Sequence, residues 1–296
     1  MTIKNLIYSK KIKMKYLYFF YNKLQILTWD VCYSGTGDKI VYICRKEKKM
    51  CFLCGYRIFN GTMNEAINKV MNQDDKIHIV SGNPEVLYNG LYNKFIYNNF
   101  TSKNSLIIPD GIGVVKPLRL KGHNIQKIAG IDLFMELLDN LDEKDSVYFL
   151  GASDEVLNIF IKNVRKKYKN IKIAGYHHGY IDIENCDYII NDIKSKQPTI
   201  IFVAMGSPKQ EIFITKYMNE LPCKIFMGVG GSFDVISETT KRAPSWIINS
   251  NLEWLYRILK EPVRIKRFKK NIDFVLMCIK DIYISNIRGL HLSNNT

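Results

Sequence analysis

The chain has 296 residues, 47% of them hydrophobic and 24% charged, which excludes a protein that is disordered throughout and suits one large α/β domain or two small ones. Its formal net charge of +15 lies at the two ends: residues 1–50 hold 11 Lys/Arg and 3 Asp/Glu, residues 241–296 hold 11 and 4, and the residues between hold 21 of each. Such ends predict an anionic partner, either lipid headgroups, a phosphorylated substrate or nucleic acid.

Residues 1–50 form a basic, aromatic extension without a sustained hydrophobic period. We expect neither a membrane span, because no apolar run approaches the roughly 20 residues required, nor a signal peptide. Seven cysteines, an odd number, argue against a secreted disulfide scaffold and for a reducing cytosol. Cys51 and Cys54 have the spacing of half a zinc site, with Cys32 and Cys44 as candidate partners, but ordinary apolar thiols near a strand explain them better.

From residue 51 onward, predicted strands and helices alternate. Thr62 and Glu65 have the spacing of a capping box, which predicts a helix start, and Pro84 suits the first turn of a second helix. The predicted strands span residues 77–80, 105–108, 146–151, 171–176, 198–206 and 223–229. Further predicted helices span residues 131–141, 153–168, 184–195 and 208–218. Because the strands are almost continuous apolar runs, we expect an α/β fold with a mostly parallel, Rossmann-like sheet covered by helices on both faces.

Ligands of such sheets bind at the carboxyl ends of the strands. The loops there are residues 81–84, 109–115, 151–153, 175–180, 205–211 and 228–234. The glycine turn, Gly228–Ser232, contains Gly230 and Gly231, and a backbone this poor in side chains can approach a ligand closely. We therefore expect it to aim several N–H groups at an anion.

Two of these loops carry candidate polar groups, each with a structural alternative. Asp110 follows a strand and can take a proton from a hydroxyl, but Asp is also an ordinary turn former. Ser81 and Asn83 can hydrogen-bond a sugar or a phosphate, or they can simply begin a helix.

The loop that starts at Gly206 has the same ambiguity. It places Ser207 at an expected N-cap, with Lys209 and Gln210 at the positive end of the following helix. That arrangement suits an anion, but a plain capped helix looks the same in sequence.

Motifs of two common nucleotide-binding classes are absent. The glycine turn lacks the G-x-G-x-x-G spacing, which disfavours an NAD enzyme, and no G-x-x-x-x-G-K-[ST] is present, which excludes a P-loop NTPase. His177 and His178 are adjacent, so on a strand they point to opposite faces and are poor joint ligands for one metal ion.

Residues 241–296 predict a basic helical appendage to the α/β core of residues 51–240. A first helix carries Trp246 to Leu259 and ends at Glu261-Pro262, since proline cannot continue it. A second helix has one apolar stripe, formed by Ile265, Phe268, Ile272, Val275, Leu276, Ile279, Ile282 and Tyr283. Its lysines lie off the stripe, so it either lies in a membrane interface or packs on the core with a solvated basic face. The charge at both chain ends favours an anionic lipid surface.

Motifs in fixed order over about residues 55–270 resemble the bacterial WecG/TagA/CpsF glycosyltransferases, which act in wall teichoic acid, enterobacterial common antigen and capsule assembly. The motifs are Thr62-Met63-Asn64-Glu65-Ala66, Asn83-Pro84-Glu85, Pro109-Asp110-Gly111-Ile112-Gly113-Val114-Val115, Gly130-Ile131-Asp132-Leu133, Phe149-Leu150-Gly151, His177-His178-Gly179-Tyr180, Gly206-Ser207-Pro208-Lys209-Gln210-Glu211 and Gly228 to Arg267. Any one of them is weak, but their order makes the resemblance specific.

The resemblance implies an inverting transfer of N-acetylmannosamine from UDP-N-acetylmannosamine to undecaprenyl-diphosphate-linked N-acetylglucosamine, with no metal or other cofactor. It also implies a cytoplasmic protein that is peripheral on the inner face of the bacterial plasma membrane. No nucleic acid is expected as a partner, and a homo-oligomer is possible. Three alternatives remain: transfer of another hexose in capsule or exopolysaccharide assembly, an inactive family member, and a non-catalytic nucleic-acid-binding protein that uses the basic ends.

The resemblance also implies roles for individual residues. Asp110 matches the proposed catalytic base, Ser81 stands where the family often has a threonine beside the substrate, and Gln210 falls in a loop that faces the active site. The expected substrate-binding residues further include Asn83, Gly206, Gly230 and Gly231. The appendage arginines expected to hold the lipid diphosphate are Arg257, Arg264 and Arg267. Two residues depart from the family pattern: Lys127 replaces a usual arginine, which weakens any bidentate contact, and Glu238 replaces a usual glycine.

Overall fold

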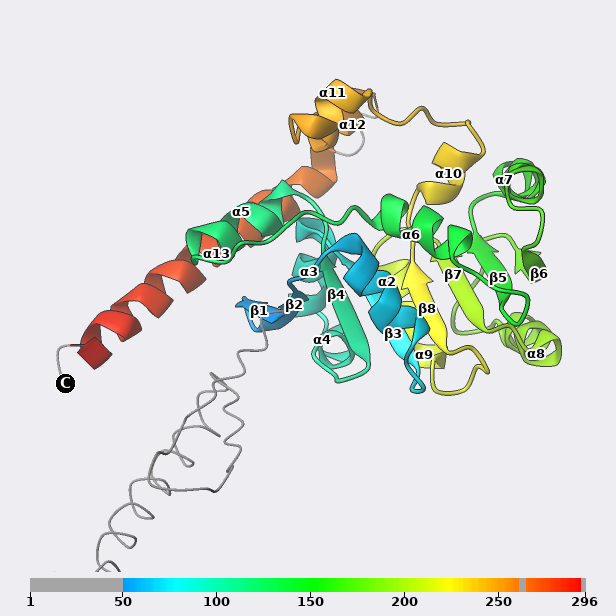
Figure 1. The fold of residues 1–296 in the computed structure, drawn as a ribbon, viewed down its shortest axis with the longest axis horizontal. Coiled ribbons are helices and arrows are strands. Elements are labelled where there is room, and N and C mark those ends of the chain that lie inside the picture. The colour runs from blue at the N-terminus through cyan, green and yellow to red at the C-terminus, as the bar shows by residue number, and fades with distance from the viewer. Residues whose placement is uncertain (1–49, 261–264, 294–296) are drawn as a thin grey trace, which may run out of the picture. The chain divides into compact units, whose positions relative to one another are not determined.

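A computed structural model describes residues 50–260 and 265–293, and within these helices the side chains of residues 257, 266, 267 and 285–293 are not described (Figure 1). Almost all of the N-terminal extension, including Cys32 and Cys44, therefore lies outside the described residues. The same holds for Arg264 and for the side chains of Arg257 and Arg267.

The predicted α/β fold is confirmed. Eight strands form one sheet in the order β1-β2-β4-β3-β8-β7-β5-β6, and all neighbours pair in parallel except β1 with β2. The strands are β1 (Met50–Leu53), β2 (Tyr56–Phe59), β3 (Ile77–Gly82), β4 (Ser105–Pro109), β5 (Ser146–Gly151), β6 (Lys172–His177), β7 (Ile200–Ala204) and β8 (Ile225–Gly228). Each of the six strands expected from the sequence is present, within a few residues of its predicted bounds.

Helices cover both faces of this sheet (Figure 1). One face packs against α2 (Met63–Met71), α6 (Gly130–Asp139), α7 (Asp154–Lys167) and α10 (Ser232–Ile236). The other face packs against α3 (Pro84–Leu91), α4 (Lys94–Phe100), α5 (Ile112–Leu120), α8 (Asp187–Lys196), α9 (Lys209–Tyr217) and α13 (Ile265–Ser293). The remaining helices are α11 (Ser245–Asn249) and α12 (Glu253–Lys260).

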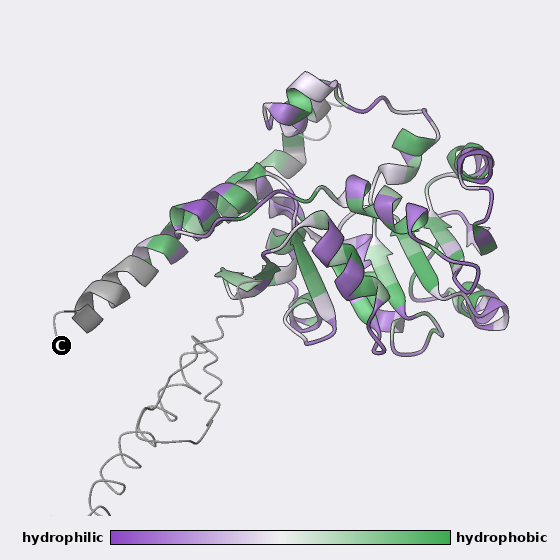
Figure 2. Cartoon of the chain, viewed as in Figure 1, coloured by the Kyte–Doolittle hydropathy of each residue, from purple (hydrophilic) through white to green (hydrophobic). Residues whose placement is uncertain are grey.

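Alternation along the strands explains why both faces are apolar. In β5, Val147 and Phe149 face the first layer of helices, whereas Tyr148 and Leu150 face the second. The central strands of the sheet are therefore largely hydrophobic on both faces, while the helices turn many of their polar residues outward (Figure 2). Thr62 caps α2 in the predicted capping box with Glu65.

The chain leaves two adjacent strands in opposite directions, and this positions the site. After β3 it enters α3 on one face of the sheet, and after the neighbouring β8 it enters α10 on the other. Such a divergence leaves a crevice at the carboxyl ends of the strands. Phe233 anchors α10 directly after the glycine turn, because its buried ring stacks on Phe160 of α7 at a centroid distance of 4.1 Å.

Several elements differ from the sequence prediction. The β1–β2 hairpin and α4 were not expected, and α5 begins inside the predicted loop 109–115 and contains Pro117. The single helix expected across Trp246 to Leu259 is divided into α11 and α12, because Asn251 adopts a left-handed φ of 59°. Glu238 also has a left-handed φ, of 63°, a conformation that glycine adopts at lower cost and that fits the glycine expected here from the resemblance.

The face of α13 that docks on the core is not its predicted apolar stripe. The helix packs against α3 and α5 through Phe274 and Cys278, which are fully buried and lie outside the predicted stripe. Most of the predicted stripe is instead exposed: Ile265, Ile272, Leu276, Ile279 and Tyr283. The helix thus has a docked apolar face and an exposed one, a combination that periodicity alone cannot resolve. None of the described helices combines the length and the apolar content that crossing a bilayer requires.

Candidate active site

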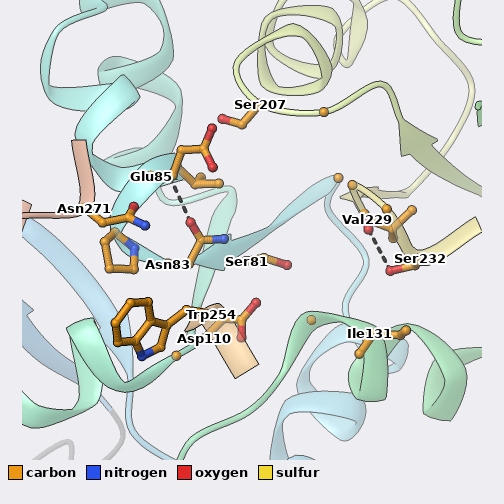
Figure 3. Close-up of a pocket in the computed structure, with 18 of the residues that line it drawn as sticks. Ser81, Asn83, Glu85, Asp110, Ile131, Ser207, Val229, Ser232, Trp254 and Asn271 are labelled. Carbon is orange, nitrogen blue, oxygen red and sulfur yellow. Dashed lines mark hydrogen bonds between the residues drawn. The ribbon is translucent and has the colours of Figure 1, made fainter. Parts of the chain in front are cut away.

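A cavity of about 920 Å³ lies at the carboxyl ends of the parallel strands (Figure 3). Residues from all six predicted loops line it, so the structure brings these loops together as the fold rule requires. Eight expected site residues lie in its wall: Ser81, Asn83, Asp110, Lys127, Gly206, Gln210, Gly230 and Gly231. In particular, Asp110 and the glycine turn face the same cavity, which a shared substrate requires.

Asp110 and Ser81 are close together beside the start of α6. Asp110 follows β4 and Ser81 lies at the end of the adjacent β3. A methyl group on Gly130 would meet the Ser81 hydroxyl oxygen and would lie 3.2 Å from Asp110 Oδ2, so the absence of a side chain there leaves room for both groups. Figure 3 shows both side chains at the cavity. A carboxylate in this position can accept the proton of a bound alcohol, and the neighbouring hydroxyl can hydrogen-bond the alcohol and orient it.

The glycine turn offers fewer donors to an anion than the sequence predicts. The Val229 N–H donates to the Val203 carbonyl, and the Ser232 N–H donates to the Val229 carbonyl. The Gly230 N–H donates to the side-chain oxygen of Gln210 at 3.0 Å. Gln210 therefore serves the turn itself, with its amide lying against Gly228, where a Cβ would come within 2.6 Å of Gln210 Nε2.

Several of the other polar loop residues bond to the protein itself, as the structural explanations of these loops predict. Asn83 caps α3, because its Oδ1 accepts from the Val86 N–H at 3.0 Å. Lys209 donates to the backbone carbonyls of Gly179 and Ile181, so it ties two loops together. The expectation that Ser207 is an N-cap is wrong: Pro208 occupies that position without a side-chain bond, and Ser207 accepts from the Asn89 amide at 2.9 Å.

The C-terminal helices close one side of the cavity. Trp254 of α12 stacks on Phe268 of α13, with ring centroids 5.0 Å apart and an interplanar angle of 10°. Asn271 and Leu276 of α13 also line the cavity. From the sequence, Trp254 could be predicted only as a helix residue. Its position in the cavity wall could not be predicted, because it depends on how α12 packs against α13.

The described part of the cavity wall is short of positive charge. Its charged residues are four acids and two bases: Glu85, Asp110, Asp234, Glu253, Lys127 and Lys209. Since Lys209 is engaged by backbone carbonyls, Lys127 is the main described cation there. Arg242, which sequence reasoning missed as a site residue, pairs with Asp132 at 2.7 Å and lies within electrostatic reach of Asp110.

The described residues contain no group of three or more side chains arranged to hold a metal ion. His177 Nδ1 is hydrogen-bonded to the His178 carbonyl at 2.9 Å. Cys54 lies near Cys278 of α13, with a sulfur–sulfur distance of 3.6 Å, and both thiols are free.

Comparison with known proteins identifies the same glycosyltransferase family as the sequence motifs. The profile of the glycosyl transferase WecG/TagA/CpsF family matches residues 51–287. The N-acetylglucosaminyldiphosphoundecaprenol N-acetyl-beta-D-mannosaminyltransferase of Bacillus subtilis strain 168 is 40% identical over 212 residues, 70% of this chain and 82% of that protein. The protein of the same name from Staphylococcus aureus strain MW2 is 37% identical over 224 residues, 73% of this chain and 87% of that protein.

Proposed function

The chain belongs to the WecG/TagA/CpsF family of glycosyl transferases, and from this we propose that it transfers N-acetylmannosamine from UDP-N-acetylmannosamine to undecaprenyl-diphosphate-linked N-acetylglucosamine. The names of the relatives at 37–40% identity support both the sugar and the acceptor. The cavity supports a substrate of this size, because about 920 Å³ is typical of sites that enclose a ligand of nucleotide-sugar dimensions. The product would enter teichoic acid or another surface polysaccharide.

The observation that carries the proposal is the position of Asp110, beside Ser81 and in the same cavity as the glycine turn. In the proposed reaction, the acceptor hydroxyl oxygen forms a bond to the anomeric carbon while the bond from that carbon to the UDP oxygen breaks. The hydroxyl proton passes to Asp110, and UDP leaves with the electron pair. One such displacement inverts the anomeric centre. Ser81 would orient the reacting hydroxyl or the sugar.

Charge supplied by the appendage would complete the site. The donor and the acceptor each carry a diphosphate, whereas the described wall is acidic overall. We therefore propose that Arg257, Arg264 and Arg267, whose side chains lie outside the described residues, hold phosphate oxygens with their guanidinium groups. Lys127 would contribute a single point charge in place of the fork of an arginine.

We further propose that the appendage, residues 241–296, rests on the anionic inner face of the plasma membrane, where the acceptor lipid is embedded. Exposed apolar side chains on α11, α12 and α13 support this: Trp246, Leu259, Ile265, Ile279 and Tyr283. Vesicles containing anionic lipid should bind the protein better than neutral vesicles. Preference for duplex DNA at physiological salt would contradict a membrane role.

The direct test is incubation with a panel of UDP-sugars and a short-chain lipid-diphosphate-N-acetylglucosamine, followed by mass spectrometry. We expect one N-acetylhexosamine to be added from UDP-N-acetylmannosamine. Transfer only from another UDP-hexose would identify a relative with a different donor, and no transfer from any donor would contradict the proposed reaction.

A further inference from the structure

Glu211, next to Gln210, is a buried carboxyl group with no role in the reaction described above. Its side chain is 3% exposed, and Oε1 accepts from Gln210 Nε2 at 2.8 Å. Oε2 makes no hydrogen bond of standard distance and angle with the described residues. Burial raises the pKa of Glu211 to about 7, an effect that the Gln210 amide and the Ser207 hydroxyl offset only in part. Such a costly group beside Gln210, which lines the cavity, calls for a reason.

The reason lies in the orientation of the Gln210 amide. Gly230 presents an N–H, so the side-chain atom that faces it must be an acceptor, which is Oε1 at 3.0 Å. Nε2 then points the other way, where it needs an acceptor, and the Glu211 carboxyl provides one. Both ends of the amide therefore select the same orientation. Whether Glu211 is ionised or protonated, its Oε1 remains an acceptor.

Further side chains connect this pair to the C-terminal helix. Lys270 of α13 donates to Asn89 Oδ1 at 2.9 Å, and Asn89 Nδ2 donates to Ser207 Oγ at 2.9 Å. Since Ser207 Oγ accepts from Asn89, its own proton can be directed to the neighbouring Glu211 carboxyl. The resulting series, which we call the Lys270–Gly230 relay, consists of Lys270, Asn89, Ser207, Glu211, Gln210 and Gly230.

We propose that Glu211 is a positioning residue that fixes the Gln210 amide, and that the relay thereby couples the docking of α13 to the conformation of the glycine turn. The part of this proposal that concerns catalysis rests on the proposed function, because the turn would then shape the donor site. Without an acceptor at position 211, the Gln210 amide loses its preferred orientation, and the Gly230 N–H loses a fixed partner. The other hydrogen bonds of the turn, from the Val229 and Ser232 N–H groups, do not hold the Gly230 N–H.

Amide hydrogen exchange of the peptide that spans the glycine turn tests the relay in the full-length protein without substrate. Glu211→Met keeps the length of the side chain but removes both oxygens, and should speed exchange of the turn about five- to tenfold. Glu211→Gln retains an acceptor for Gln210 Nε2 and should restore slow exchange. Unchanged exchange in Glu211→Met, or equally fast exchange in both variants, would overturn the inference.

A matched pair of variants on α13 tests the Lys270 end of the relay. Lys270→Met removes the donor to Asn89, whereas Lys269→Met removes the same charge from an exposed neighbour. Only the first should speed exchange of the turn, and equal effects would contradict the relay. This pair also carries the test alone if Glu211→Met does not fold.

The transfer reaction gives an independent readout. Glu211→Met should raise KM for the UDP-sugar about tenfold or more while Glu211→Gln stays close to the parent, because the donor site would be misshaped and the base left intact. If no UDP-sugar is used, the exchange experiment still decides the relay. If transfer proceeds while exchange and KM are unchanged in Glu211→Met, the relay alone is refuted.

Discussion

The buried carboxyl of Glu211 makes the stability of this protein depend on pH in a direction opposite to that of most carboxylates. An ordinary Glu has a pKa of 4.5, whereas burial raises the pKa of Glu211 to about 7 in the folded state. The folded state therefore holds the proton more tightly than the unfolded state does. Stability from this group is fully present below the unfolded value of 4.5 and is lost as the pH rises through the folded value.

The size of this effect follows from the two pKa values. Their separation corresponds to about 3 kcal/mol over the whole titration, since one pKa unit is worth about 1.4 kcal/mol. Between about pH 5.5 and pH 8 the wild-type protein should lose about 2 kcal/mol from this source. Glu211→Gln does not titrate, so the variant should gain that amount relative to the wild type across the same interval.

Urea unfolding at both pH values, followed by circular dichroism, gives the two free energies. Only the difference between variant and wild type is used, because other titrating groups cancel in it. Glu143→Gln, which removes an exposed carboxylate, is the control for a general effect of net charge. A difference for Glu211→Gln that does not change with pH, or that changes in the opposite sense, would refute the account of a desolvated carboxyl.

Three further predictions concern the site and the docked helix. Asp110→Asn should lower kcat by about 10²- to 10⁴-fold, the usual contribution of a general base, with circular dichroism unchanged, and full turnover would rule out that role. Gly130→Ala should place a methyl group against Ser81 and Asp110 and lower kcat/KM more than tenfold, whereas unaltered activity would show that the two groups need no such space. Mild oxidation should join Cys54 and Cys278, whose sulfurs are 3.6 Å apart, and the linked peptides should be found by mass spectrometry; their absence would mean that α13 does not dock as described.

Much of the fold could be predicted because the strands of the central sheet carry strong local signals. Ile200–Ala204 is apolar at every position, as a strand buried on both faces must be, and Thr62 and Glu65 mark a helix start through contacts only three residues apart. The rule that sites form at strand ends then locates the loops without any knowledge of side-chain positions.

What could not be predicted depends on contacts between distant parts of the chain. The β1–β2 hairpin is formed by strands of four residues each, too short for a clear period. The apolar stripe of α13 was found, but which side of the helix would dock depended on the shape of α3 and α5. Glu211 and Asn89 are unremarkable in sequence, and only burial beside Gln210 and Ser207 reveals them.

The two apolar sides of α13 have a practical consequence for experiments that shorten the chain. Phe274 and Cys278 complete a hydrophobic cluster with α3 and α5, and Lys121 pairs with Asp281 at 2.7 Å. A truncation before α13 would therefore leave water in contact with core side chains, and the product would aggregate whether or not the helix ever meets a lipid. Replacing Ile279 or Tyr283, which are exposed and do not line the cavity, with glutamate alters only the outward side, and so separates attachment to a bilayer from the integrity of the folded enzyme.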